Sequence, residues 1–192
     1  MDLKQLIHTS ANQLDQAKVA FGHGTLNAQD EAAWLVLWQL KLPLDLDLNE
    51  DILGLQQQVA SAHAKVDLGN ISPNQIEACQ ALIAERIQTR KPAAYLTQEA
   101  WLQGIPFYVD ERSIVPRSFI AELIAEGAFD AWLSETSHSF LDLCTGNGSL
   151  AVLCAMAYPE IEVIGADISK DALAVAKINV DQHQLSHRIQ LV

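Results

Sequence analysis

The segment that most constrains the fold spans residues 140–151 and reads FLDLCTGNGSLA. It starts with the composition of a buried strand, which Asp142 interrupts. Gly146 and Gly148 then form a turn before a helix that begins near Ser149. Glycine lets the backbone approach a ligand closely, and the first turn of a helix presents free N–H groups. The segment therefore predicts a strand–loop–helix nucleotide site.

The order of elements from residue 139 onward predicts an α/β unit. Strands ending at Cys144, over 161–166 and from Arg188 alternate with helices that end near Tyr158 and His183. This alternation calls for a parallel sheet with right-handed crossovers. Three parallel strands alone leave an apolar sheet edge bare. We therefore expect a C-terminally truncated chain, and dimerisation through that edge would cover it.

The first 91 residues read as a helical bundle. Apolar residues at helical spacing predict helices over about 2–19, 28–41, 56–65 and 73–91. Thr25 or Asn27 is expected to cap the second helix. Ser72, Pro73 and Gln75 form a near-complete capping box for the fourth.

A connector over residues 92–117 separates this bundle from the α/β unit. Apolar residues on either side of Gln103-Gly104 predict a β-hairpin, with Pro106 suited to an edge position. Ser118 can then cap a helix. The expected domains are thus a helical domain over 1–91, the connector over 92–117 and an incomplete α/β domain over 118–192.

Composition limits the environment and the partners. The net charge of −12 repels nucleic acid and favours a basic partner. An equally weighted alternative is that this charge only keeps the protein in solution. Three cysteines form an odd set without metal-ligand spacing, so we expect no disulfide framework, no metal and a cytoplasmic location. No apolar run approaches the ~20 residues that cross a bilayer, and we expect neither a membrane span nor a signal peptide.

Two cofactor classes fit the glycine loop. Gly146, Gly148 and Ala151 satisfy a dinucleotide fingerprint, and Asp167 lies where a ribose-binding acid is expected, so an NAD-dependent oxidoreductase is permitted. Against this class stands Asp142, because a buried carboxylate is costly unless a ligand or a neighbour uses it. A cationic ligand such as S-adenosylmethionine would do so.

The spacing of Asp142, Gly146, Gly148 and Asp167 resembles motif one and the following acid of class I (Rossmann-like) methyltransferases. The resemblance implies that the glycines admit the amino-acid part of S-adenosylmethionine, that Asp167 binds the ribose and that Ile168 lines the adenine pocket. Two alternatives accompany it. Asp167 could merely cap the helix that begins near Lys170. Cys144, which stands where these enzymes usually have glycine, is expected to be a small packing residue rather than a nucleophile.

Further motifs resemble the HemK/PrmB family of N5-glutamine methyltransferases. They are PAAYLT at 92–97, WLQGIPFYVDER at 101–112, VPRS at 115–118 and DALAVAKINV at 171–180. The early motif FGHGTLNAQDEA at 21–32 is similar to the branch that methylates a glutamine of large-subunit ribosomal protein three. The resemblance implies that the helical domain recognises this basic protein substrate. It implies a cofactor site made of Pro116, Arg117, Glu122, Asp142, Cys144, Thr145, Gly146, Gly148, Asp167 and Ile168.

This chain departs from the family pattern in two places. Phe119 replaces the usual proline, and the catalytic Asn-Pro-Pro-Tyr motif, expected after a fourth strand, is not in the sequence. No residue of this sequence can therefore be assigned the catalytic role that the family's motif has, and we expect the 192-residue chain to be inactive by itself. Detectable methylation of the ribosomal protein by this chain would contradict that expectation. A non-catalytic protein-binding module is the alternative in another class.

Overall fold

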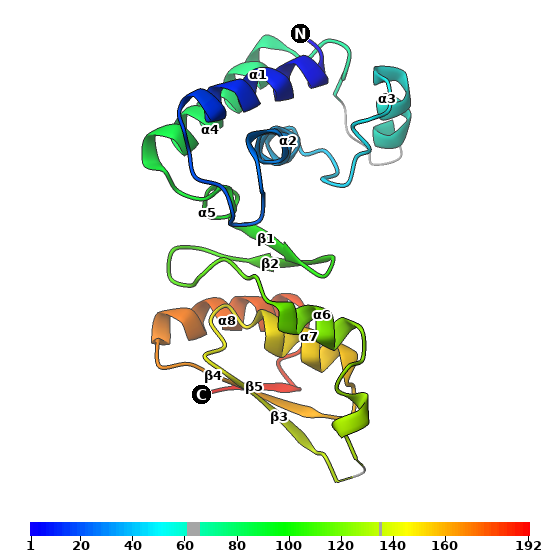
Figure 1. Cartoon of the computed structure of the whole chain (residues 1–192), viewed down its shortest axis with the longest axis vertical. Coiled ribbons are helices and arrows are strands. Elements are labelled where there is room, and N and C mark those ends of the chain that lie inside the picture. The colour runs from blue at the N-terminus through cyan, green and yellow to red at the C-terminus, as the bar shows by residue number, and fades with distance from the viewer. Residues whose placement is uncertain (61–65, 135) are drawn as a thin grey trace. The chain divides into compact units, whose positions relative to one another are not determined.

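The computed structural model describes residues 1–60, 66–134 and 136–192. These form two compact units, Met1–Thr97 and Gln98–Val192, each with its own hydrophobic core (Figure 1). The first unit is helical and the second contains both sheets, so the α/β class predicted from the sequence is confirmed. The three-part division with a separate connector over 92–117 stays a prediction.

The helical unit contains five helices in the part of it that the structure describes. They are α1 (Leu3–Gln16), α2 (Ala28–Gln39), α3 (Ile52–Ala60), α4 (Pro73–Thr89) and α5 (Ala93–Thr97). Helix α3 begins before the predicted residue 56, because Asp51 accepts a hydrogen bond from the Gly54 N–H at 2.8 Å and so starts the helix earlier. The rest of the predicted helix, residues 61–65, lies outside the described residues.

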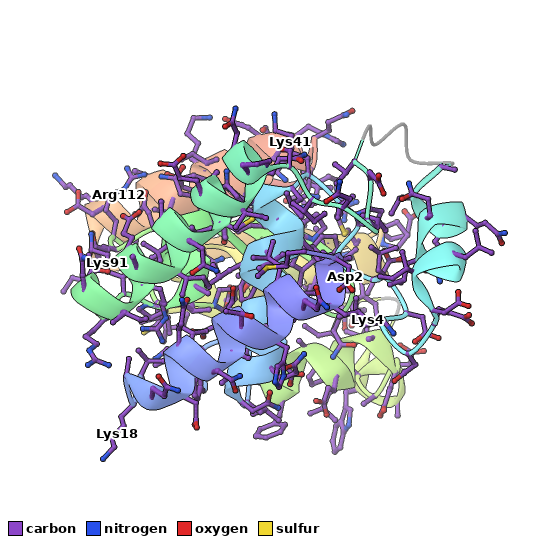
Figure 2. The ribbon with its side chains drawn as sticks, turned by 90° about the horizontal axis from the view of Figure 1, so that it is seen from above. Asp2, Lys4, Lys18, Lys41, Lys91 and Arg112 are labelled. Atoms are coloured by element: carbon purple, nitrogen blue, oxygen red, sulfur yellow. The ribbon has the colours of Figure 1, made fainter. Side chains whose placement is uncertain are left out.

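The capping residues of this unit explain where its helices begin. Ser72 and Gln75 form the predicted capping box, in which Gln75 Oε1 accepts from the Ser72 N–H at 3.2 Å. Asn27, rather than Thr25, caps α2 and accepts from the Asp30 N–H at 2.9 Å. These caps satisfy backbone N–H groups that have no partner within the helix. Beyond the end of α1, Lys18 points away into solvent (Figure 2).

A buried ion pair joins two helices of this unit. Arg86 on α4 donates from Nε to Glu31 on α2 at 2.7 Å, and both side chains are 2% exposed. Thr25 donates to the other oxygen of Glu31 at 2.9 Å, and Arg86 also donates to the Ala20 carbonyl at 2.8 Å. The motif that begins at Phe21 is thus tied to α4 through buried polar contacts.

The second unit begins with the predicted β-hairpin. Strands β1 (Glu99–Leu102) and β2 (Ile105–Tyr108) pair antiparallel, with Trp101 opposite Pro106. Gln103 and Gly104 both have positive φ, at 50° and 73°, which is the backbone conformation of a two-residue type I′ turn.

A three-stranded parallel sheet follows in the same unit. The remaining elements are α6 (Phe119–Ala125), the short 3₁₀ helix η1 (Asp130–Trp132), β3 (Ser139–Leu143), α7 (Ser149–Ala157), β4 (Glu162–Ala166), α8 (Lys170–Gln182) and β5 (Ile189–Leu191). The strand order is β3-β4-β5, which confirms the predicted parallel arrangement. Figure 1 shows α6, α7 and α8 on one side of the sheet. On the other side, Leu141 and Leu143 of β3 are 58% and 72% exposed.

Candidate cofactor site

The loop between β3 and α7 is shaped by three residues with left-handed backbone. Cys144, Gly146 and Gly148 have φ values of 63°, 57° and 79°. A Cβ at Gly148 would lie 3.0 Å from the Cβ of Ala176 on α8, so glycine is needed there for close packing. A Cβ at Gly146 would meet nothing within 4 Å. The loop is therefore packed on one side at Gly148 and faces open space at Gly146.

Asp142 is buried, as the sequence predicts, with 7% of its surface exposed. Its carboxylate accepts a hydrogen bond from Thr145 Oγ1 at 2.6 Å. Burial raises the pKa of Asp142, and the negative charge of Asp167 raises it further, while hydrogen bonds from Thr145 and the Ala151 backbone lower it. The net direction is upward, so this site disfavours the ionised carboxylate unless a positive charge lies nearby.

Asp167 joins the ends of the two neighbouring strands β3 and β4. Its Oδ2 accepts from the Gly146 N–H at 2.9 Å, and its Oδ1 accepts from the Ser169 N–H at 2.9 Å. Ser169 is the residue that caps α8, with its side chain accepting from the Ala172 N–H at 3.2 Å. The alternative that Asp167 caps this helix is therefore wrong.

Cys144 does not pack inside the protein as expected. Its side chain is exposed, and its position after the last residue of β3 has a left-handed backbone. The turn needs a positive φ at this position, which glycine adopts without steric cost and cysteine does not. The expectation of a small packing residue is therefore wrong, and the left-handed backbone explains why glycine suits this position.

Asn147 and Asn179 are two polar residues of this region that the sequence analysis missed. Asn147 is 3% exposed, and its Nδ2 has no hydrogen-bond partner among the described residues. Asn179 is fully buried on α8 and donates from Nδ2 to the Asn147 carbonyl at 2.8 Å. The available signal was the asparagine in DALAVAKINV, which falls on the apolar face of the helix.

The other predicted site residues occupy different environments. Ile168 is fully exposed directly after Asp167. Pro116 is buried and Arg117 is exposed, both just before α6. Glu122 is exposed in the first turn of α6, which packs against α7. The structure thus brings Asp142, Thr145, Gly146 and Asp167 together through the contacts above, and it leaves the roles of the other residues as predictions.

The described parts of the chain contain no cluster of metal-binding side chains, and two of the three cysteines are buried. Within residues 1–60, 66–134 and 136–192, no group of three His, Cys, Asp or Glu side chains could hold a metal ion. Cys79 and Cys154 are buried, and burial raises the pKa of their thiols to about 11 and about 12. Such thiols are protonated at neutral pH and unreactive.

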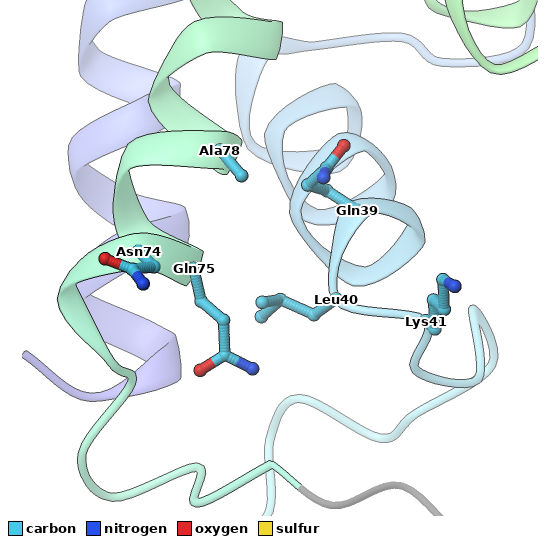
Figure 3. A pocket seen from close by; sticks show the side chains of 6 residues that line it. All are labelled: Gln39, Leu40, Lys41, Asn74, Gln75 and Ala78. Atoms are coloured by element: carbon cyan, nitrogen blue, oxygen red, sulfur yellow. The ribbon is translucent and has the colours of Figure 1, made fainter.

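A cavity of about 280 Å³ lies in the helical unit, remote in sequence from the glycine loop. It is formed where α2 ends and α4 begins, and Figure 3 shows its lining residues Gln39, Leu40, Lys41, Asn74, Gln75 and Ala78. Gln75 is already engaged in the capping box with Ser72. None of these residues was a predicted site residue.

No helix within the described segments combines the length and the apolar character that a bilayer span requires.

Comparisons with known proteins place the glycine loop in a methyltransferase domain. A family model described as "Methyltransferase domain" matches residues 134–191. The chain is 46% identical over 191 residues to a ribosomal protein uL3 glutamine methyltransferase of Burkholderia pseudomallei, covering 98% of this chain and 57% of the relative. It is 40% identical over 195 residues to proteins of the same name from Neisseria meningitidis serogroup B and Neisseria gonorrhoeae, covering 99% of this chain and 58% of each relative.

The chain therefore spans a little under three fifths of the length of the curated relatives it matches. The resemblance to glutamine methyltransferases that the sequence motifs indicate is confirmed by these relatives. Over nearly its whole length, the chain is similar to part of proteins named ribosomal protein uL3 glutamine methyltransferase.

Proposed function

We propose that this chain binds S-adenosylmethionine at the glycine loop and forms part of an N5-glutamine methyltransferase that acts on ribosomal protein uL3. The observation that carries the proposal is the cluster of Asp142, Thr145, Gly146 and Asp167 within the matched methyltransferase domain. When bound, S-adenosylmethionine supplies an electrophilic methyl group on a sulfonium centre.

Asp142 supports a cationic ligand. Its carboxylate is buried, its pKa is raised, and no basic side chain is among the causes of the shift. A ligand that carries an ammonium and a sulfonium would favour the ionised form and offset the cost of burial. The protein can therefore use this otherwise unfavourable carboxylate to bind a positively charged molecule.

Asp167 supports recognition of a ribose. Each of its two carboxylate oxygens accepts one backbone N–H, from Gly146 and from Ser169. A carboxylate oxygen has two lone pairs, so each oxygen retains capacity for a ribose hydroxyl donor. The two backbone bonds also fix the orientation of the carboxylate before a ligand arrives.

The open space at Gly146 also fits this ligand. A side chain at residue 146 would project into the space beside the loop, and glycine keeps that space free.

The chemistry of the reaction defines which groups must bind the acceptor glutamine. An amide nitrogen is a poor nucleophile because its lone pair is delocalised, so the acceptor glutamine must be aligned with the methyl group and its N–H groups must be held by acceptors. We assign no described residue to that role. The residues of this chain are assigned to cofactor binding and orientation.

The helical unit and the charge of the chain support the protein substrate. The relatives are named for ribosomal protein uL3, and a net charge of −12 favours association with a basic protein. A ribosomal substrate also implies a cytoplasmic location. We assign recognition of this substrate to the unit formed by residues 1–97.

Calorimetric titration of the chain with S-adenosylmethionine and, separately, with NAD tests the cofactor. We expect saturable binding of S-adenosylmethionine that Asp167→Ala weakens and that NAD does not reproduce. Binding of NAD alone would refute the methyltransferase proposal.

Co-purification with uL3 tests the proposed protein substrate, with an unrelated basic protein of similar charge as the control. Equal retention of both proteins would refute the assignment of uL3.

A further inference from the structure

Asn179 connects two segments that are distant in sequence from it and from each other. From α8, its Nδ2 donates to the Asn147 carbonyl in the glycine loop at 2.8 Å and to the Tyr108 carbonyl in β2 at 2.9 Å. Its Oδ1 accepts from the Tyr108 N–H at 2.7 Å. One buried amide therefore ties the glycine loop to the hairpin through three hydrogen bonds.

An asparagine is well suited to this position. Its amide offers two donors and one acceptor group, and Asn179 uses both kinds while being fully buried. Tyr108 contributes its N–H and its carbonyl to the same side chain, as a neighbouring strand would. If the amide were lost, the Asn147 carbonyl and both backbone groups of Tyr108 would lose these partners inside the protein, which is costly.

The surrounding contacts of α8 reinforce the same connection. One turn before Asn179, Ala176 lies where a Cβ on Gly148 would approach it to 3.0 Å, so the helix backs the glycine loop. One turn after it, His183 Nε2 forms a hydrogen bond with the Pro106 carbonyl at 2.9 Å, and its ring packs against Phe107. Helix α8 thus contacts the loop and β2 in consecutive turns, with Asn179 at the junction.

We propose that Asn179 is a positioning residue of the cofactor site. Its side chain holds the glycine loop at a fixed position relative to β2 and thereby sets the affinity for the cofactor. This inference rests on the proposed function, in which the loop binds S-adenosylmethionine. Asn179 acts through the Asn147 carbonyl, and a cofactor that fixes the loop also stabilises the Asn179–Tyr108 hydrogen bonds. Cofactor binding therefore also stabilises the backbone of the hairpin at Tyr108.

The first test compares two substitutions on α8. Asn179→Ala removes all three hydrogen bonds, whereas Val180→Ala removes buried apolar volume from the adjacent position, which is 3% exposed, and leaves the amide in place. At a temperature well below both melting transitions, we expect Asn179→Ala to weaken S-adenosylmethionine binding by about 10-fold and Val180→Ala by less than about two-fold. Equal affinities for Asn179→Ala and the wild type, or equal losses in the two variants, would overturn the inference.

The second test needs no substitution and so does not depend on a variant that folds. Amide hydrogen exchange of the wild-type chain is followed at Tyr108, whose N–H donates to Asn179, with and without saturating S-adenosylmethionine. We expect cofactor to slow exchange at Tyr108. Unchanged exchange there, with cofactor bound, would overturn this inference alone, whereas a wild-type chain that binds no S-adenosylmethionine would overturn the proposed function with it.

Discussion

The Gly146 N–H donates to Oδ2 of Asp167 at 2.9 Å, so the turn after β3 and the end of β4 are joined by a direct hydrogen bond. This bond gives Asp167 a structural task in addition to the ribose contact proposed for it. We expect Asp167→Ala to weaken S-adenosylmethionine binding by about 10-fold or more, because a tether and an acceptor are both lost. Calorimetry measures the change. Asp171→Ala, which removes an exposed acid from the first turn of α8, is the control and should bind like the wild type.

Asp142→Asn should have opposite effects on the stability of the fold and on the affinity for S-adenosylmethionine. Burial raises the folded-state pKa of Asp142 above its ordinary value of 3.8, so the folded state binds the proton more tightly than the unfolded state does. The resulting contribution to stability is fully present below pH 3.8 and is lost as the pH rises through the folded-state pKa. Asparagine keeps an acceptor for Thr145 and has no charge to bury.

The expected result for Asp142→Asn without cofactor is therefore a higher free energy of unfolding than wild type at pH 7. The advantage should shrink as the pH falls toward 4. Urea unfolding at several pH values checks this, and an advantage that grew on acidification would refute the pKa argument. At neutral pH the same variant should bind S-adenosylmethionine more weakly, since the proposed counter-charge is gone.

Cys144→Gly should stabilise the chain. Cys144 has a φ of 63°, and a left-handed backbone costs a non-glycine residue roughly 1–2 kcal/mol, part of which is offset by the greater entropy of glycine in the unfolded chain. We expect a net gain of about 0.5–1 kcal/mol in the free energy of unfolding. Cys144→Ala, which removes the thiol and keeps the Cβ, should show no such gain. A loss of stability in the glycine variant would contradict the backbone argument.

The buried pair of Glu31 and Arg86 should be sensitive to removal of one partner. Arg86→Met leaves the Glu31 carboxylate buried without its cation, and we expect a loss of about 3–5 kcal/mol in the free energy of unfolding. Adding Glu31→Leu should recover much of it, because two apolar side chains replace two buried charges. Denaturant unfolding of the single and double variants gives the coupling free energy between the Glu31 and Arg86 side chains. Lys177→Ala, at a pair whose side chains are 68% and 48% exposed, should leave the stability nearly unchanged, because solvent screens an exposed pair.

Local chemistry explains which parts of the fold were predictable. The capping box at Ser72 and the turn at Gln103-Gly104 depend on residues next to each other in the chain, and both were predicted. The parallel strands followed from their alternation with helices. The burial of Asp142 followed from its place within an apolar run. These features are encoded in short segments whose conformational preferences need no knowledge of distant residues.

Pairings between distant segments were not predictable in the same way. Glu31 and Arg86 are 55 residues apart, and Asn179 reaches Tyr108 across 71 residues. A sequence pattern indicates that a polar residue lies on an apolar face, and it does not identify the partner that makes burial tolerable. The Cys144 prediction failed for a related reason, because its exposure depends on the φ that the completed turn imposes.

The glycine loop has a consequence for the charge of its ligand. The N–H groups of Thr145, Gly146, Gly148 and Ser149 all donate to acceptors within the protein: the Ala166 carbonyl, Asp167, the Thr145 carbonyl and the Asn147 side chain. A pyrophosphate needs such amides pointing outward, as in loops that cradle phosphates. Here a pyrophosphate would meet amides that are already engaged, and its negative charge would disfavour ionisation of the buried Asp142 still further. The glycine spacing that permits a dinucleotide in the sequence thus forms, in three dimensions, a loop whose amides are already paired, in agreement with the proposed cationic ligand.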